Sequence, residues 1–264
     1  MTLNKIRSCA GFLCCLIGAS LPAVSQSQID KSLFEINNVV YTGGQIQFKV
    51  TNHSKPVLAY LVDVTWHLPN GHTRTHVFAK DLIFTFALPG KIIAPPGTHV
   101  GALKTGESIT WNFYSPAPPG TNISVEPLAV VYTDNSVVGD EKLAASEIFA
   151  PRQEFVNVMS QHLNSLQQLT SLSPEDILSK LKDLKSQYDT RSSEDTRTAA
   201  TTNGAPSTQA NSDSLMRDRL SYEIDHLIKQ ISAGSVAPNA ALSDYIDGIA
   251  DQLSVYKSHA IPAY

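Results

Sequence analysis

The chain has 264 residues, a formal net charge of −4 and only three cysteines. Acidic and basic residues are nearly balanced along it, so neither half has the basic excess that binding to nucleic acid or to an anionic membrane surface requires. Nucleic acid is therefore excluded as a partner.

Residues 1–25 have the three parts of a secretory signal peptide. Lys5 and Arg7 make a positive start, Cys9–Ala19 is apolar, and small residues at 23–25 offer a cleavage site. The apolar stretch is shorter than the roughly 20 residues that a membrane anchor needs. We therefore predict cleavage, an extracytoplasmic (periplasmic or secreted) protein, and no stable membrane span after cleavage.

All three cysteines lie within this predicted signal peptide. The mature chain would then have no disulfide and no cysteine available as a metal ligand or nucleophile. Removing 25 residues from 264 leaves 239, enough for one sizeable core or two modest ones, which apolar burial alone must stabilise.

Residues 26–139 have the pattern of an antiparallel β-sandwich. Phe34, Ile36 and Val40 share one parity, and the same pattern resumes after the turn at 42–44, which predicts a hairpin. Residues 57–66 alternate so strongly that we expect a central strand with one face fully buried.

The later strands of this region follow from turns and parity. Asn70-Gly71 predicts a tight turn into a more polar strand at 72–78. Further strands are expected at 82–88, around Trp111 and at 123–132, where the apolar parity switches at Pro127 and predicts a β-bulge. About eight short strands without intervening helices indicate a sandwich.

Residues 140–264 have helical spacing instead. Over 140–189, apolar residues recur at intervals of three or four, with a break expected at Pro151 and a new helix beginning at Ser173-Pro174. Residues 190–214 contain little that is apolar and predict a flexible linker, and two amphipathic helices follow in 215–264. The simplest arrangement is one bundle whose halves the linker joins.

A long tether has a further consequence for the C-terminal helices. The second helix pair could dock elsewhere or exchange between chains, so these helices are a candidate contact for a homo-oligomer.

Three histidines, His67, His72 and His76, are the best candidates for a metal site. His72 and His76 would point to the same face of a strand, with His67 approaching from its neighbour, and three imidazoles suit zinc or copper. However, residues 67–76 contain no carboxylate, and histidines four apart on a strand lie about 13 Å apart. We therefore expect a polar, outward strand face, with no metal and no cofactor.

Motifs for catalysis are missing from the sequence. It has no Gly-x-Ser-x-Gly elbow, no His-Glu-x-x-His helix and no glycine-rich phosphate loop. Carboxylate pairs such as Asp140-Glu141 lie at expected helix starts, where the helix dipole accounts for them. The triplets that begin at Asn52 and Asn122 match the N-glycosylation pattern but are interpreted as turn or strand residues.

One stretch resembles a known family. The residues that carry the resemblance are Val50-Thr51-Asn52 with Ser54, Val62-Asp63-Val64, Asn70-Gly71 and Leu103–Ser108 leading into Ile109-Thr110-Trp111. This layout is similar to the immunoglobulin-like sandwiches of secreted bacterial proteins, the FxLYD-type domains among them. It covers about half the mature chain, lacks the family's naming motif and has an extra insertion at 82–97. The resemblance implies a fold and an extracytoplasmic setting but no catalytic residues.

These observations favour a non-enzymatic protein that binds or scaffolds at the bacterial cell envelope, through a sheet edge or the loops at one end of the sandwich. Its partner would be a protein or another envelope component. The alternative is a metal-binding protein or hydrolytic enzyme that uses the strand carrying His67, His72 and His76.

Overall fold

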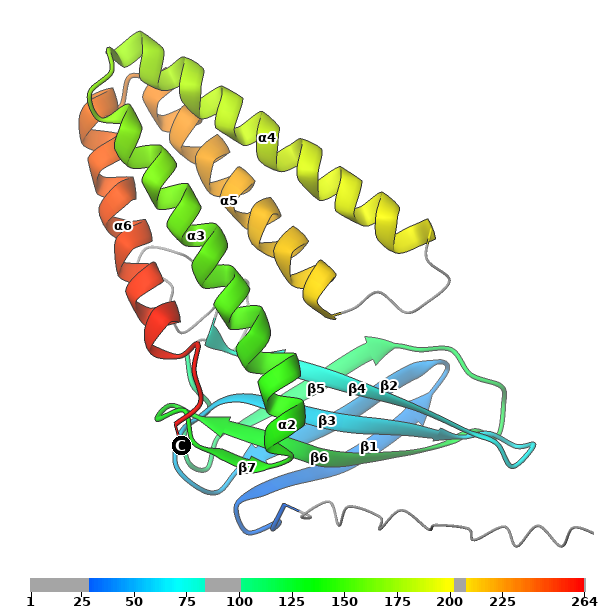
Figure 1. Ribbon diagram of the computed structural model, residues 1–264. Coiled ribbons are helices and arrows are strands. Elements are labelled where there is room, and N and C mark those ends of the chain that lie inside the picture. Colours follow the sequence, from blue (N-terminus) through cyan, green and yellow to red (C-terminus); the bar gives the residue numbers. More distant parts are fainter. Residues whose placement is uncertain (1–28, 84–100, 202–207, 264) are drawn as a thin grey trace, which may run out of the picture.

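A computed structural model describes residues 29–83, 101–201 and 208–263, without the side chains of 191–201 and 208–215. Within these residues the chain forms two antiparallel sheets with seven strands, followed by four long helices (Figure 1). The predicted order, a β region and then a helical region, is confirmed. The predicted signal peptide and most of the strand expected at 82–88 lie outside the described residues.

The two sheets pack face to face in a sandwich-like arrangement. One has the order β1-β2-β5 and the other the order β4-β3-β6-β7. Aromatic and β-branched residues from both sheets, such as Phe48 and Val62, fill the space between them. The strands are β1 (Phe34–Thr42), β2 (Gln45–Asn52), β3 (Val57–His67), β4 (Thr73–Asp81), β5 (Ser108–Tyr114), β6 (Asn122–Tyr132) and β7 (Val137–Gly139).

Strand β3 is the central strand that the alternation predicts. Tyr60 and Trp66 lie in the core between the sheets, whereas Ala59 and Leu61 point the other way and pack under the start of the helical region. Two neighbours flank it, β4 on one side and β6 on the other. Both faces of its first half are therefore buried, and its outward face becomes polar toward His67.

Two of the register shifts in the sheets bear on the predicted parity of the strands. The predicted bulge in β6 is confirmed, because Leu61 pairs with Ala129 while the next residue pairs with Pro127, which leaves one extra residue in β6. The prediction for Val40 was wrong. A second bulge at Asn38, which has a positive φ of 53°, reverses the parity of β1, so Val40 is exposed and Tyr41 packs on the core.

The break expected at Pro151 is also not observed. A short helix α2 (Glu141–Ala144) runs through a π-helical segment η1 (Ala145–Phe149) into α3 (Ala150–Leu169). Proline lacks an amide N–H and its ring crowds the carbonyl one turn earlier. The wider π turn immediately before Pro151 accommodates both effects, so the helix continues.

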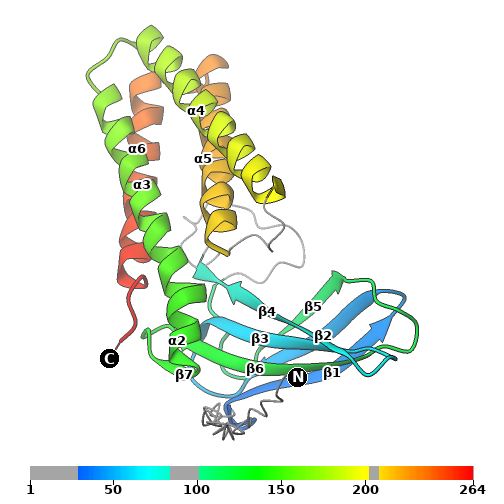
Figure 2. The same ribbon diagram turned by 45° about the vertical axis from the view of Figure 1, so that its right-hand side comes forward.

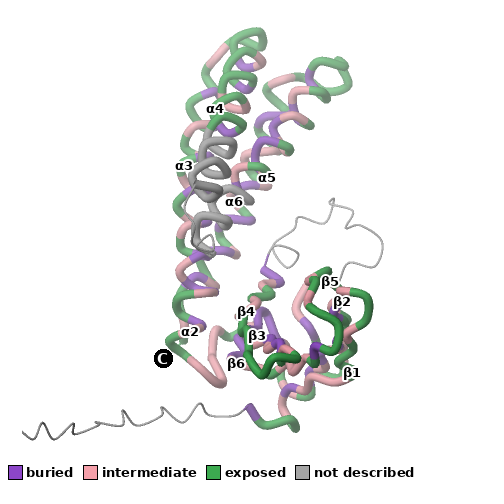
Figure 3. The backbone as a smooth tube through the Cα atoms, turned by 90° about the vertical axis from the view of Figure 1, so that its right-hand side faces the viewer, coloured by how far each residue is buried: buried purple, intermediate pink, exposed green. Residues whose placement is uncertain are grey.

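The four long helices form one bundle (Figures 1 and 2). Each of them contributes buried residues to a single apolar core, as predicted, including Leu166, Leu181, Ile224 and Leu253. Buried positions follow the inward faces of the helices in Figure 3. After α3 come α4 (Pro174–Thr201), α5 (Thr208–Ser232) and α6 (Pro238–Ser258).

Helices α4 and α5 extend into the predicted linker from both ends. Residues up to Thr201 and from Thr208 onward are helical, and 202–207 lie outside the described residues. The flexibility of this segment stays a prediction. Among the described residues, no helix combines the length and the apolar character needed to cross a membrane.

A buried ion pair joins the sandwich to the bundle. Arg152 at the start of α3 has no exposed side-chain surface and donates from Nε and Nη2 to both oxygens of Asp81, at 2.7 and 2.9 Å. Its Nη1 donates to the carbonyl of His259, beyond the end of α6. Two residues after Asp81, Ile83 is buried in the core of the bundle. The two regions are thus in direct, specific contact.

Candidate functional site

The three candidate histidines do not come together. Residues paired across β3 and β4 share a face, and His76 pairs with Val64 whereas His67 pairs with Thr73, so His76 and His67 lie on opposite faces of the sheet. His72 lies in the turn between the two strands, where its N–H donates to Asn70 Oδ1. No group of three or more His, Cys, Asp or Glu side chains in the described parts of the chain is placed to hold a metal ion.

Each of these histidines instead has a local contact. His67 Nε2 lies 3.0 Å from Ser124 Oγ on β6. His76 packs its ring edge-on against Phe78, with 4.6 Å between centroids. The expected single outward face is therefore wrong for His76, because this residue pairs with core-facing Val64 and lies on the face toward the other sheet, whereas His67 lies on the opposite face.

The turn beginning at Asn52 is structural. The Asn52 side chain is fully buried, and its Nδ2 donates to the carbonyls of Leu103 and Lys55 at 2.8 and 3.1 Å. Its Oδ1 accepts from the N–H and hydroxyl groups of Ser54. Every polar atom of this side chain is thus bonded within the fold. The first glycosylation triplet therefore has no free amide, whereas Asn122 in the second is exposed.

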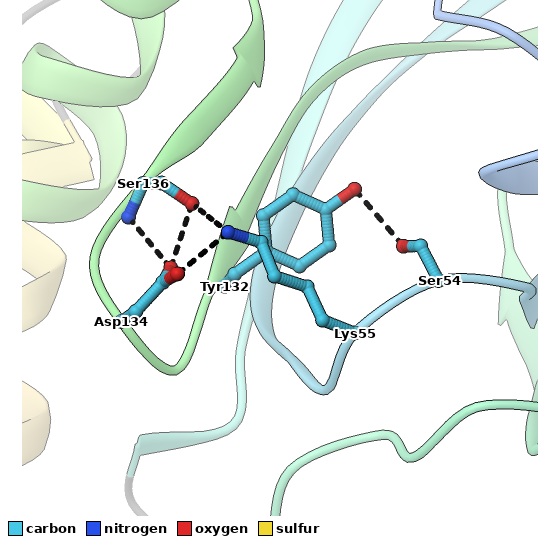
Figure 4. Close-up of polar contacts among 5 residues, drawn as sticks. All are labelled: Ser54, Lys55, Tyr132, Asp134 and Ser136. Carbon is cyan, nitrogen blue, oxygen red and sulfur yellow. Dashed lines mark hydrogen bonds and ion pairs between the residues drawn. The ribbon is translucent and has the colours of Figure 1, made fainter.

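A polar cluster ties this turn to the hairpin of β6 and β7 (Figure 4). Lys55 Nζ donates to Asp134 Oδ2 and to Ser136 Oγ, both at 2.6 Å, and lies 4.7 Å from the ring centroid of Tyr132. The Tyr132 hydroxyl in turn accepts from Ser54. Hydrogen bonds from Lys55 and Ser136 hold the pKa of Asp134 at about 2. The carboxylate thus stays charged and the cluster serves as a clamp.

The same hairpin receives the end of the helical region. Asn135 has a positive φ of 64°, which presents its side chain to the residues after α6. Its Nδ2 donates to the carbonyl of Ser258, and its Oδ1 accepts from His259 Nδ1 at 2.7 Å. The contacts of Asn135 and the ion pair of Arg152 therefore fix the bundle to one end of the sandwich.

The open side of the sandwich, between the edge strands β4 and β5, is different. Arg74, Phe78 and Lys80 of β4 pair with Trp66, Val62 and Tyr60, so they share the face that points toward the other sheet. From β5, Trp111 and Phe113 approach them, with the Phe78 ring 4.8 Å from Phe113 and 6.3 Å from Trp111. We call Arg74, His76, Phe78, Lys80, Trp111 and Phe113 the β4–β5 lip.

The charge of this lip is positive. The Arg74 guanidinium lies 4.3 Å from the Trp66 ring centroid and Lys80 Nζ lies 5.9 Å from that of Trp111. Neither cation forms an ion pair with any carboxylate in the described chain. Residues 73–80 and 108–114 contain no Asp or Glu. The nearest acid along β4, Asp81, is bound by Arg152.

The sequence analysis did not find the lip. Its signal was present in residues 74–80, where a cation or aromatic ring occupies every second position. The alternation does not show whether β4 has a neighbouring strand on both sides or on one side only. The number of neighbours decides whether this row of side chains is buried within the sheet or lies at its edge. The sheet order shows that β4 has β3 as its one neighbour among the described strands.

Comparisons with models of known families, with curated proteins and with solved structures find no match to this chain.

Proposed function

We propose that this chain is an exported, non-enzymatic binding or scaffolding protein of the bacterial cell envelope. Its immunoglobulin-like sandwich would bind an extended acidic segment of a partner protein along β4. The single observation that carries the proposal is the position of β4 as an exposed edge strand that carries unpaired cations.

An edge strand offers backbone groups to an incoming strand. Nine residues, Thr73–Asp81, form β4, and most of them are exposed. A row of free N–H and C=O groups can pair with an extended peptide, which supplies affinity, while alternate side chains supply specificity. At this edge those side chains are Arg74, His76, Phe78 and Lys80. They favour a partner strand with carboxylates and apolar groups.

Export and the absence of catalysis have separate support. The expected location follows from the signal peptide pattern of residues 1–25 and from a mature chain without cysteine. Against an enzyme, the prominent polar groups at the end of the sandwich already bond within the fold: Asn52 in the turn, Lys55 with Asp134, and Arg152 with Asp81. A binding role needs only an exposed surface such as the β4–β5 lip.

The test uses residues 26–264 and a labelled nine-residue peptide of alternating Glu and Thr, matched in length to β4. We expect saturable binding by fluorescence anisotropy that weakens with added salt. Arg74→Glu with Lys80→Glu should weaken binding about tenfold or more. A matched pair on exposed lysines away from the lip, Lys31→Glu with Lys257→Glu, should leave it unchanged.

Two further peptides separate strand pairing from simple charge attraction. The same Glu-Thr peptide with alternate backbone nitrogens methylated cannot pair with an edge strand, and a Lys-Thr peptide has the opposite charge. Both should fail to bind. Equal binding of the methylated peptide would overturn strand addition, and equal binding of the Lys-Thr peptide would overturn the acidic partner.

A further inference from the structure

A chain of buried and partly buried polar side chains crosses the core of the bundle. His162 of α3 is fully buried at its centre. Its Nδ1 lies 3.0 Å from the Tyr188 hydroxyl on α4, and its Nε2 lies 3.1 Å from the Tyr245 hydroxyl on α6. One imidazole therefore contacts two other helices through two phenols.

The chain continues from Tyr245 to α5. Tyr245 donates to Glu223 Oε2 at 3.3 Å, and Glu223 Oε1 accepts from Arg219 Nε at 2.8 Å. Arg219 also donates to Gln252 Oε1 and to the Tyr256 hydroxyl, both on α6. The hydrogen bonds thus connect all four helices of the bundle.

The direction of these hydrogen bonds fixes the state of His162. Because Tyr245 gives its hydroxyl proton to the carboxylate of Glu223, its oxygen accepts from His162, and Nε2 must carry the imidazole proton. Nδ1 then accepts from the hydroxyl of Tyr188. Neutral His162 is satisfied at both nitrogens, whereas protonation places a second N–H against Tyr188 and reverses that hydrogen bond.

Among the described side chains, a protonated His162 would also form no ion pair with a carboxylate. The charged groups on the helices around it are Glu223 and Arg219 of α5, which are paired with each other, while α4 and α6 present the phenols of Tyr188 and Tyr245. Burial lowers the pKa of His162 to about 4. Burial also raises the pKa of Tyr245, so this hydroxyl remains a proton donor.

We propose that this chain of contacts is an acid-sensitive latch: protonation of His162 reverses its hydrogen bond to Tyr188, places a charge in the core and opens the bundle at the contact of α3 with α4, while the sandwich stays folded. The core between the sheets is built from apolar and aromatic residues and has no buried histidine in the described chain. Lowering the pH should therefore destabilise the bundle more than the sandwich.

Two spectroscopic signals separate the regions. Both tryptophans, Trp66 and Trp111, lie in the sandwich, so tryptophan fluorescence follows that region, and far-UV circular dichroism at 222 nm follows the helices. The unfolded chain binds the proton near pH 6.5 and the folded bundle only near 4. Stability is therefore complete above pH 6.5 and falls as the pH drops toward 4, where the equilibrium constant for opening is about 160-fold larger; the increase approaches about 300-fold only below pH 4.

The proposal predicts that acid reduces the helical signal before the fluorescence changes. His162→Gln should remove this pH dependence, and His226→Gln, at an exposed position on α5, should retain it. Coincident transitions of the two signals, or a wild-type pH dependence in His162→Gln, would overturn the latch. If His162→Gln does not fold, NMR titration of the wild-type rings decides the question: His162 must stay neutral at pH 5, and its titration together with the exposed histidines would overturn the proposal.

Discussion

The sandwich and the bundle fill their interiors in different ways. Between the sheets the buried side chains are almost all apolar or aromatic, with Phe48 stacked on Trp111 at 5.4 Å and Asn52 bonded at the rim. Inside the bundle, His162, Gln252 and the partly buried pair of Arg219 and Glu223 interrupt stripes of leucine and isoleucine. The two regions meet at the buried ion pair of Arg152.

The difference follows from how each kind of element fixes its register. Strands are aligned by backbone pairing, and a slip by one residue would turn every apolar side chain outward. Helices packed through repeating leucines can slide or rotate with little loss of apolar contact. Buried hydrogen bonds can single out one alignment. His162, which reaches both α4 and α6, is placed to do this.

The largest change in stability is expected when the ion pair between the two regions is broken. Arg152→Met leaves Asp81 half-buried without its cation, and we expect a loss of about 3 kcal/mol in the free energy of unfolding. Urea denaturation measures it. Adding Asp81→Leu should restore much of the loss, since apolar pairs can replace buried ion pairs. A fully stable Arg152→Met protein would contradict a stabilising role for this ion pair.

The second test removes a buried polar side chain at the rim of the sandwich, that of Asn52. Asn52→Ala leaves the carbonyls of Leu103 and Lys55 without their donor, so we expect a loss of about 2 kcal/mol, seen in the fluorescence transition. The neighbouring His53 is exposed, and His53→Ala serves as the control with little effect. Equal effects of the two substitutions would contradict the structural role of Asn52.

Patterns within one segment predicted most of the fold. Strand β3, the bulge near Pro127 and the start of α4, where Ser173 Oγ accepts from the N–H of Asp176, all follow from local alternation or capping. The bulge at Asn38 did not, because parity alone does not show that a residue adopts positive φ, although asparagine tolerates it.

The lip and the latch depend on long-range pairing. Phe78 meets residues of β5 some 33 positions later in the chain, 111 minus 78 for Trp111. His162 and Tyr245 are 83 residues apart. No local pattern relates such positions, and polar residues on an amphipathic helix look solvent-exposed until the helices are assembled.

A smaller loss of stability is expected when one hydrogen bond inside the bundle is removed. Tyr188→Phe removes the hydroxyl that donates to His162, and we expect a loss of about 1 kcal/mol at pH 7 in the transition followed by circular dichroism. Tyr222 on α5 is 74% exposed, and Tyr222→Phe should have no effect. If the two variants unfold alike, the buried hydrogen bond contributes nothing to stability.

The smallest expected change is a gain in the sandwich. Asp63 lies opposite Glu126, and burial together with that neighbouring charge raises the pKa of Asp63. Asp63→Asn should stabilise the protein by roughly 0.5 kcal/mol at pH 7, measured by thermal denaturation. The advantage should shrink as the pH falls, because the wild-type carboxyl then takes up a proton. Exposed Asp251→Asn is the control.

The contacts of Arg152 also favour an order in which the two regions assemble. Asp81 precedes this arginine by 71 residues, and His259 follows it by 107. The chain emerges from its N-terminus, so the sandwich is complete before α6 appears, and domains generally fold in the order of their emergence. For that interval Arg152 has its carboxylate but lacks its last acceptor. Packing of α6 onto the bundle is therefore the final step. It adds the carbonyl of His259 as an acceptor for the Arg152 guanidinium, which Asp81 of the sandwich already binds.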